Sequence, residues 1–333
     1  MSRDGILLLG GSGFIGSALS RRLALMGRPV HVVSRTPPLP VPAALVLSAS
    51  PAEPGSAGCA IAPCGLPDVR HHTGSLDDPA LLEARRHDCA TVIHLASAST
   101  PGSSARNPAR ELDNLGPLAR LLEQLRHWPQ THLIFLSSGG TVYGNPATTP
   151  VAEDAPLAPL SFYGAGKVAM ESFLQAFRSQ AHPVTILRPS NCYGPGQSLR
   201  HGFGLVRTVL QQLQNGAPVE VWGDGESVRD YLYIDDLVAA ILKTIALPAD
   251  NGTYNIGSGQ GHSINAILET VSALGVGRLQ TNYRPARSVD VRAVVLDNGR
   301  AAAALDWRPR VGVSEGVRRT WDWLQQDNQR DES

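Results

Sequence analysis

The segment GILLLGGSGFIG, residues 5–16, constrains the fold of this chain more than any other stretch. A short apolar run leads into glycines at positions 10, 13 and 16, and apolar residues then recur at helical spacing from Ile15 to Met26. The order strand, glycine turn, helix is typical of a dinucleotide-binding unit, because the pyrophosphate must approach backbone N–H groups at the helix N-terminus. A side chain at Gly10 or Gly13 would obstruct that approach. An ordinary tight turn is the alternative.

Charge and cysteine content limit the possible partners. The 333 residues include 29 Lys plus Arg and 29 Asp plus Glu, so no basic surface for nucleic acid or an anionic membrane is expected. The apolar runs are too short to span a bilayer and the N-terminus lacks a signal-peptide pattern, which predicts a cytoplasmic protein. The four cysteines include no C-x-x-C pair, so no metal site is expected.

The next predicted strand, Val30–Val33, ends at Ser34 and Arg35, where such a unit meets the adenosine ribose. An acid there would indicate NAD. Arginine can hold the 2′-phosphate of NADP or stack on adenine while NAD is bound, so these residues leave the choice open. Residues 36–67 are rich in Pro, Ala and Ser and predict a long surface loop, with one strand near residues 44–47.

A pair of residues suited to proton transfer stands in the middle of the chain. Tyr163 and Lys167 are four positions apart, so they share one face of a helix. An ammonium beside a phenol favours the phenolate and lowers the tyrosine pKa from its usual value of roughly 10. Such pairs also occur by chance. The preceding glycine turn and the loop SSGGTVYG, residues 137–144, favour a catalytic role.

Together these segments resemble the extended branch of the short-chain dehydrogenase/reductase superfamily, which contains nucleotide-sugar epimerases and dehydratases. The resemblance runs from Gly10 to about Val313, through GGSGFIG, HLA, SSGGTVYG, YGAGK, RPSNCYGPGQ and RDYLYIDD. It implies an α/β fold with a Rossmann-type doubly wound parallel sheet and a smaller C-terminal substrate-binding α/β region. The implied dinucleotide-binding domain is residues 1–190 with a returning segment at about 228–256, and the implied nucleotide-sugar region is residues 191–227 and 257–333.

The resemblance implies NAD as the cofactor, with NADP not excluded. Ser75 and Leu76 would border the adenine, and the end of the strand at residues 91–96 would pass under the cofactor. Asn114 matches a family asparagine where Pro117 should disturb a helix, although it could simply face solvent. The full expected cofactor set is Gly10, Gly13, Phe14, Ile15, Gly16, Ser34, Arg35, Ser75, Leu76, Leu95, Ala96, Ser97, Asn114, Tyr163 and Lys167.

In the resembling family a loop hydroxyl hydrogen-bonds the same sugar oxygen as the tyrosine, and the matching position here is Gly139. If the loop is extended, alternation puts Thr141 on the side of Gly139, so Thr141 is the first candidate for that hydroxyl and Ser138 the second. With Tyr163 and Lys167 these residues form the expected catalytic set. Family dehydratases carry an acidic step at positions 140–141, so its absence here disfavours dehydration.

Four residues of the second half match the family's nucleotide-diphosphate contacts: Asn191, Arg229, Arg287 and Asp290. An arginine can donate two parallel hydrogen bonds to phosphate oxygens, which suits it to this task. Either arginine could instead form a structural ion pair.

The resemblance therefore implies an NAD-dependent 4-epimerase of a UDP-hexose, N-acetylhexosamine or hexuronic acid, with Tyr163 as the base and a transient 4-keto sugar. An NADPH-dependent reductase of a 4-keto nucleotide sugar and a non-catalytic dinucleotide-binding regulator are the alternatives. The leucine-striped segment 112–125 and the helix that carries Tyr163 would pair with their copies in a homodimer, unless their apolar sides pack against the sheet.

Overall fold

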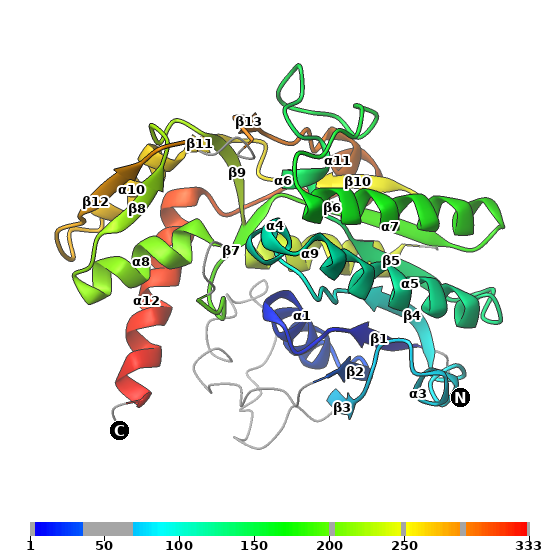
Figure 1. Ribbon diagram of the computed structural model, residues 1–333. Helices are drawn as coiled ribbons and strands as arrows, with labels where there is room; N and C mark the ends of the chain where they lie inside the picture. Colours follow the sequence, from blue (N-terminus) through cyan, green and yellow to red (C-terminus); the bar gives the residue numbers. More distant parts are fainter. Residues whose placement is uncertain (1–3, 36–68, 200–203, 248–250, 287–290, 332–333) are drawn as a thin grey trace.

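The computed structural model describes residues 4–35, 69–199, 204–247, 251–286 and 291–331 (Figure 1). The strand expected near residues 44–47 and the expected substrate residues Arg287 and Asp290 lie outside these ranges.

A seven-stranded, fully parallel sheet forms the centre of the molecule, in the order β10-β6-β5-β4-β1-β2-β3 (Figure 1). Its strands are β1 (Gly5–Leu9), β2 (Val30–Ser34), β3 (Val69–Thr73), β4 (Cys89–His94), β5 (His132–Leu136), β6 (Val184–Pro189) and β10 (Thr253–Ile256). β1, β5 and β6 are buried along their whole length, because helices cover both faces of the sheet. The expected doubly wound α/β fold is confirmed.

Alternation along β1 divides the core between the two faces. Leu7 and Leu9 pack with α3 (Pro79–Glu83), α5 (Leu112–Leu125) and α7 (Phe162–Ser179), whereas Ile6 and Leu8 pack with α1 (Phe14–Leu25) and α9 (Ile234–Ala246). The chain reverses its direction of travel across the sheet between β1 and β4. The carboxyl ends of these two strands therefore flank the crevice where open α/β sheets bind ligands.

Three short helical segments lie near that crevice. They are α4 (Pro101–Arg106), the 3-10 helix η1 (Pro108–Glu111) and α6 (Gly139–Val142). All three contact α7, so the first half of α7 is enclosed on several sides.

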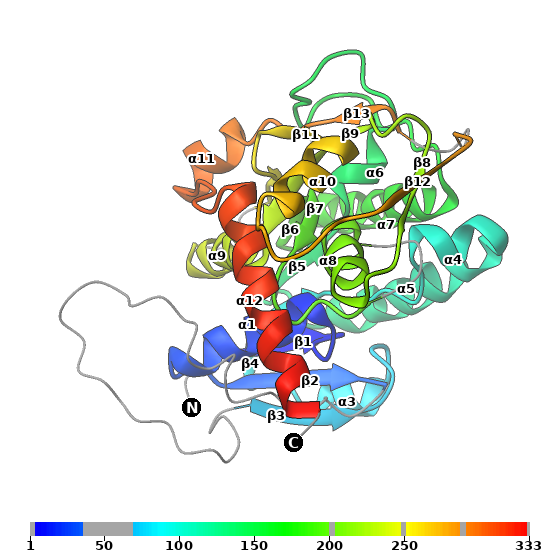
Figure 2. The same ribbon diagram turned by 90° about the vertical axis from the view of Figure 1, so that its left-hand side faces the viewer.

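The second region has its own small sheets (Figures 1 and 2). β7 (Asn191–Tyr193), β9 (Val228–Tyr233), β11 (Gly261–Ser263) and β13 (Ala293–Val294) form one, and β8 (Val219–Trp222) pairs with β12 (Thr281–Arg284). The helices of this region are α8 (Leu205–Asn215), α10 (Ile264–Ser272), α11 (Gly299–Leu305) and α12 (Val313–Asp331). One apolar cluster continues from α1 and α9 into α8, α10 and α12. In the segment at about 228–256, which is expected to return to the dinucleotide-binding domain, β10 joins the large sheet and β9 lies in a small sheet.

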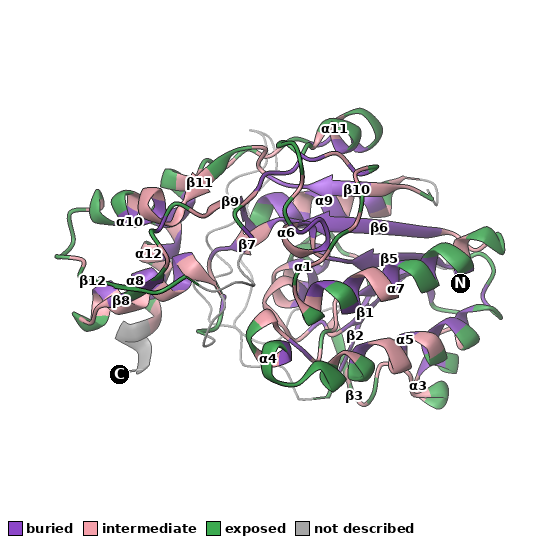
Figure 3. Ribbon diagram, turned by 45° about the horizontal axis from the view of Figure 1, so that its top comes forward, coloured by how far each residue is buried: buried purple, intermediate pink, exposed green. Residues whose placement is uncertain are grey.

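The apolar stripes of α5 and α7 face mainly inward. Leu118 and Leu121 of α5 pack against the large sheet with Met170 and Leu174 of α7. A smaller apolar set remains on the outer surface, where Leu112, Phe162 and Phe173 are 66%, 50% and 45% exposed. Figure 3 shows the exposed outer sides of both helices. Over the described ranges, no helix combines the length and apolar character needed to cross a membrane.

Candidate active site

The glycine turn after β1 has the geometry of an anion site. Gly10 has a φ of +83°, and a Cβ there would lie 2.6 Å from the Cα of Ala96, so the fold itself requires glycine at this position. A Cβ at Gly13 would meet only the carbonyl oxygen of Gly10, at 3.6 Å, so the space over Gly13 is open. Gly13 is also the N-cap of α1 and no side chain caps this end, which leaves first-turn N–H groups available to a phosphate.

The other expected cofactor residues lie along the same edge of the sheet. The N–H of Gly74 donates to the carbonyl oxygen of Ser34 over 3.0 Å, which brings the ends of β2 and β3 together beside Ser75. Leu95 donates its N–H to the carbonyl oxygen of Leu9 over 2.9 Å, and Ala96 contacts the glycine turn. Arg35 is exposed after the end of β2. This continuous edge, with an uncapped helix end and open space at its centre, fits an extended dinucleotide.

Asn114 is buried, so the solvent-facing interpretation is wrong. Its Oδ1 accepts from the N–H of Ala98 over 2.7 Å, and its Nδ2 donates to the Oγ of Ser99 over 2.8 Å. The side chain thus fixes the loop after β4. The disturbance expected from Pro117 is limited to the one hydrogen bond that proline cannot donate, because α5 continues through this residue.

Tyr163 and Lys167 lie in the first turns of α7. Ser161 caps this helix by accepting from the N–H of Gly164 over 3.1 Å. The Nζ of buried Lys167 donates to the carbonyl oxygen of Leu136 over 3.0 Å and lies 5.8 Å from the centroid of the Tyr163 ring. Both side chains are therefore on the expected shared face, next to the end of β5.

The electrostatics of this pair differ from the sequence prediction. Burial lowers the pKa of Lys167 to about 8, although Glu111 and Glu171 oppose the change. Burial and the Glu111 carboxylate raise the pKa of Tyr163. The net direction for the Tyr163 pKa is thus opposite to the one expected from an ammonium beside a phenol, because desolvation disfavours the phenolate.

The loop SSGGTVYG is not extended. Residues Gly139–Val142 form the helical turn α6, and the Thr141 hydroxyl donates back to the carbonyl oxygen of Ser138 over 3.3 Å. The expectation that Thr141 shares the side of Gly139 is wrong, because residues two apart in a helix lie on nearly opposite sides. Gly139 does not leave an empty hydroxyl position either. A Cβ there would lie 2.6 Å from the Cδ1 of Leu296.

Ser138 becomes the better-placed hydroxyl. Its backbone is extended, it stands at the N-cap of α6, and its side chain makes no capping hydrogen bond. It is two residues from Leu136, whose carbonyl oxygen binds Lys167. Among the described residues this hydroxyl has no hydrogen-bond partner, so it is available to a substrate oxygen.

A buried polar network supports this loop. Arg188 binds Glu171, with 2.6 Å between Nη2 and Oε2, and donates from Nη1 to the Tyr143 hydroxyl over 2.7 Å. Ser137 donates its hydroxyl to Glu171, and Tyr143 donates to the Oδ1 of Asn255 over 2.7 Å. The sequence interpretation missed these residues. The spacing of Glu171, four positions after Lys167, is the one local signal that could have indicated it.

On the substrate side, Asn191 faces the loop. A Cβ at Gly140 would lie 3.4 Å from the Nδ2 of Asn191, and this Nδ2 donates to the carbonyl oxygen of Asp230 over 3.0 Å. Arg229 lies on β9, paired with β11 on one side and β13 on the other. The neighbouring Asp230 is fully buried and accepts hydrogen bonds from Ser190 and from two other segments of the chain, which fixes the strand that carries Arg229.

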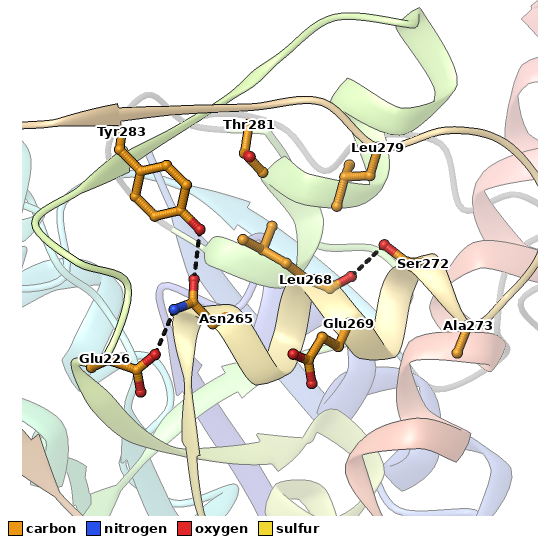
Figure 4. A pocket seen from close by; sticks show the side chains of 9 residues that line it. All are labelled: Glu226, Asn265, Leu268, Glu269, Ser272, Ala273, Leu279, Thr281 and Tyr283. Atoms are coloured by element: carbon orange, nitrogen blue, oxygen red, sulfur yellow. Dashed lines mark hydrogen bonds between the residues drawn. The ribbon is translucent and has the colours of Figure 1, made fainter.

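A surface hollow of about 740 Å³ lies elsewhere, between α10 and β12 (Figure 4). At one end Tyr283 donates its hydroxyl to the Oδ1 of Asn265 over 2.9 Å, and Asn265 donates to Glu226 over 2.6 Å. None of the expected site residues within the described ranges line it, so the chemistry is assigned to the crevice of the large sheet. In the described part of the chain, no group of three or more His, Cys, Asp or Glu side chains could hold a metal ion.

Comparisons with known proteins agree with this geometry. Residues 6–257 match the model of the NAD dependent epimerase/dehydratase family. A dTDP-4-dehydro-6-deoxyglucose reductase of Escherichia coli is 30% identical over 327 residues, which are 95% of this chain and 96% of that protein. A UDP-glucose 4-epimerase of Thermotoga maritima, solved with UDP-glucose, is 31% identical with a TM-score of 0.83, over 97% of this chain and 99% of that chain. A UDP-glucose 4-epimerase of Thermus thermophilus, solved in complex with NAD, is 29% identical with a TM-score of 0.81, over 96% and 99% of the two chains.

Proposed function

Because the chain belongs to the NAD dependent epimerase/dehydratase family, we propose that it is a 4-epimerase of a nucleotide-diphosphate sugar with NAD as its cofactor. The observation that carries the proposal is the joint placement of Tyr163 and Lys167 beside the end of β5, where Ser138 offers a free hydroxyl. The expected substrates are a UDP-hexose, a UDP-N-acetylhexosamine or a UDP-hexuronic acid. The similarity to UDP-glucose 4-epimerases supports the first of these.

The glycine turn and the edge after β4 would hold NAD, which would accept the hydride and later return it. Tyr163 takes the proton of the sugar 4-hydroxyl, and Ser138 holds the same oxygen by a hydrogen bond. Lys167 stabilises the phenolate form by its charge. After the 4-keto sugar has turned, Tyr163 would return the proton to the same oxygen, and the configuration at C4 would be inverted once the hydride is also returned.

This cycle needs a firmly held diphosphate and a mobile sugar. We assign the binding of the diphosphate to Arg229 and Arg287. Asn191, which lies beside the serine loop at residues 137–144, would also contact the nucleotide diphosphate, and Asp290 would bind its nucleotide part. The buried carboxylate of Asp230 supports the assignment of Arg229, because it fixes the adjacent position of β9.

A second candidate is an NADPH-dependent reductase of a 4-keto nucleotide sugar. Two observations favour it. Ser34, at the end of β2, and Arg35, directly after it, offer no acid to bind the ribose hydroxyls, and the Escherichia coli relative is a 4-dehydro sugar reductase. The same Tyr163 and Lys167 would serve, with the phenol acting as the acid.

We also propose that the enzyme is a homodimer formed through α5 and α7. Their stripes lie mostly against the sheet, but Leu112, Phe162 and Phe173 remain exposed on these two adjacent helices. Phe173→Glu would then yield a monomer by light scattering, whereas a monomeric native protein with full activity would contradict the proposal.

One experiment separates the two enzymatic candidates. The cofactor that co-purifies is identified by mass, and the protein is incubated with UDP-glucose, UDP-N-acetylglucosamine and UDP-glucuronic acid while proton NMR follows the coupling of H4. An epimerase interconverts the axial and equatorial H4 signals with no net change in nicotinamide absorbance, and Tyr163→Phe loses this activity. Consumption of NADPH with a 4-keto sugar, and no epimerisation, would support the reductase instead. Inactivity of the loaded native protein in all these assays would contradict both.

A further inference from the structure

We propose that Glu111 is a positioning residue of this active site, held against α7 between Tyr163 and Lys167 so that its charge acts on both. The proposal rests on the proposed function, since it concerns the proton carrier of that reaction. Nothing in the local sequence indicates it, because Glu111 is far from both residues along the chain.

The contact with α7 is direct. A Cβ built on Gly166 would collide with the Oε2, Cδ and Cγ atoms of Glu111. Gly166 immediately precedes Lys167 and follows Tyr163 by three positions. Because Gly166 has no side chain, the Glu111 carboxylate can lie against the surface of α7. It does so at the height of Tyr163 and Lys167, the two residues proposed to act in proton transfer.

Two neutral donors fix the carboxylate from the other side. Ser104 of α4 donates its hydroxyl to Oε1, and the Nδ2 of Asn114 donates to Oε2 over 3.2 Å. Asn114 also holds the loop after β4 through Ala98 and Ser99. Glu111 thus belongs to the same hydrogen-bonded group that holds the loop after β4, where the cofactor is expected to bind.

The other charged groups around the pair are paired, neutral or exposed to solvent. Glu171, one turn beyond Lys167 on α7, is bound by Arg188 of β6, and burial lowers the pKa of His94 on β4 to about 3, which keeps it neutral. Arg106 of α4, Arg110 of η1 and Asp113 of α5 are exposed to solvent. Glu111 is therefore the carboxylate whose charge reaches both members of the pair.

The negative charge of Glu111 favours the protonated form of both residues, and this helps different steps of the proposed reaction. It supports the charged form of Lys167 against burial, and it favours the protonated form of Tyr163, which must give its proton back in the return step. Removing the charge makes the phenol easier to ionise and the ammonium easier to deprotonate. Both pKa values are then expected to fall.

The decisive variant is Glu111→Gln, which keeps the size of the side chain and removes its charge. For the NAD-loaded enzyme, we expect the alkaline limb of kcat/KM to move to lower pH by about one unit, given the separation of these groups and an effective protein dielectric. The matched control is Asp113→Asn, two residues further along and exposed, which should leave the profile in place. A Glu111→Gln profile that superimposes on the native one, in a protein with native melting, would overturn the proposal.

A spectroscopic measurement does not depend on turnover. Phenolate absorbance is titrated with and without Tyr163→Phe in the native and Glu111→Gln backgrounds, and the difference isolates Tyr163. Its phenolate should appear at lower pH in Glu111→Gln. If the native enzyme converts no nucleotide sugar, the proposed function fails while this titration still decides the role of Glu111.

The contact itself is tested by a pair of variants. Gly166→Ala should reduce turnover more than tenfold, because the new methyl group displaces the carboxylate. Adding Glu111→Ala to Gly166→Ala frees the space, so the double variant should be more active than Gly166→Ala alone. A double variant with the product of the two single losses would contradict the contact, even if Glu111→Gln does not fold.

Discussion

The ammonium of Lys167 donates to the carbonyl oxygen of Leu136 over 3.0 Å, and this bond fastens α7 to the end of β5. The same bond keeps the charge of Lys167 between the Tyr163 ring and the start of the serine loop. This one contact therefore positions both the Tyr163–Lys167 pair and the hydroxyl of the serine loop. A substitution in α7 should alter the position of the loop, and a substitution in the loop should alter the position of the pair.

The charge state of Lys167 sets an upper pH limit for activity. Burial lowers the pKa of Lys167 to about 8, so the side chain is charged below this value and loses its proton as the pH rises through it. We expect kcat/KM to fall on the alkaline side with a midpoint near this pH. Lys167→Met should lower turnover by about 10²-fold and abolish that limb. A native profile that stays level far into the alkaline range would show that the ammonium is not required.

The two candidate hydroxyls should differ in effect. Ser138→Ala removes the free hydroxyl at the N-cap of α6 and should lower kcat by about 10²-fold. Thr141→Val removes a hydroxyl that donates to a backbone carbonyl and should change kcat less than about threefold. Steady-state kinetics of both variants decide between them. The opposite order of losses would return the role to Thr141.

The buried pair of Glu171 and Arg188 should matter for folding. Glu171→Ala leaves the Arg188 guanidinium buried without its anion, and the free energy of unfolding should fall by about 3–5 kcal/mol in urea titrations. Asp306→Asn, which breaks the exposed ion pair with Lys243, is the matched control and should leave the urea midpoint in place. Equal effects of the two substitutions would show that burial of the Glu171 pair is unimportant.

His94 should make the fold sensitive to acid. It is buried, neither ring nitrogen is hydrogen-bonded to a described residue, and burial lowers its pKa to about 3. Below about pH 6.5 the His94 imidazole binds a proton in the unfolded chain but stays neutral in the folded chain. The free energy of unfolding therefore decreases as the pH falls to about 3. Between neutral pH and about pH 4 the loss should be about 3 kcal/mol smaller in His94→Leu. Exposed His127 is the control. Between neutral pH and about pH 4, the free energy of unfolding of His127→Leu should decrease as much as that of the native protein.

Local spacing predicted the parts of the structure that depend on neighbours in sequence. The strand, glycine turn and helix at residues 5–25 and the shared face of Tyr163 and Lys167 are of this kind, because periodicity fixes which side chains point together. The serine loop was mispredicted because two consecutive glycines carry no side chains to indicate a strand or a helix. Packing of Gly139 against Leu296, which is far along the chain, accompanies the helical turn.

The remaining features of the site depend on contacts between distant segments. Glu111 meets Gly166, and Glu171 meets Arg188, through the packing of different elements on the sheet. The pKa of Tyr163 likewise follows from how deeply α7 is covered. Asn114 could be assigned to the site from the resemblance, but its bonds to Ala98 and Ser99 required the loop after β4 in place.

The late arrival of β10 has a consequence for synthesis of the protein on the ribosome. This strand completes the edge of the large sheet beside β6, yet its residues follow the small sheet's strand β9 in the chain. It also brings Asn255, which accepts from the Tyr143 hydroxyl and donates to the Val151 carbonyl oxygen. A nascent chain that has not yet emerged to Ile256 therefore carries an unpaired β6 edge, open to chaperones or to other nascent chains, and lacks the last support of its catalytic loop.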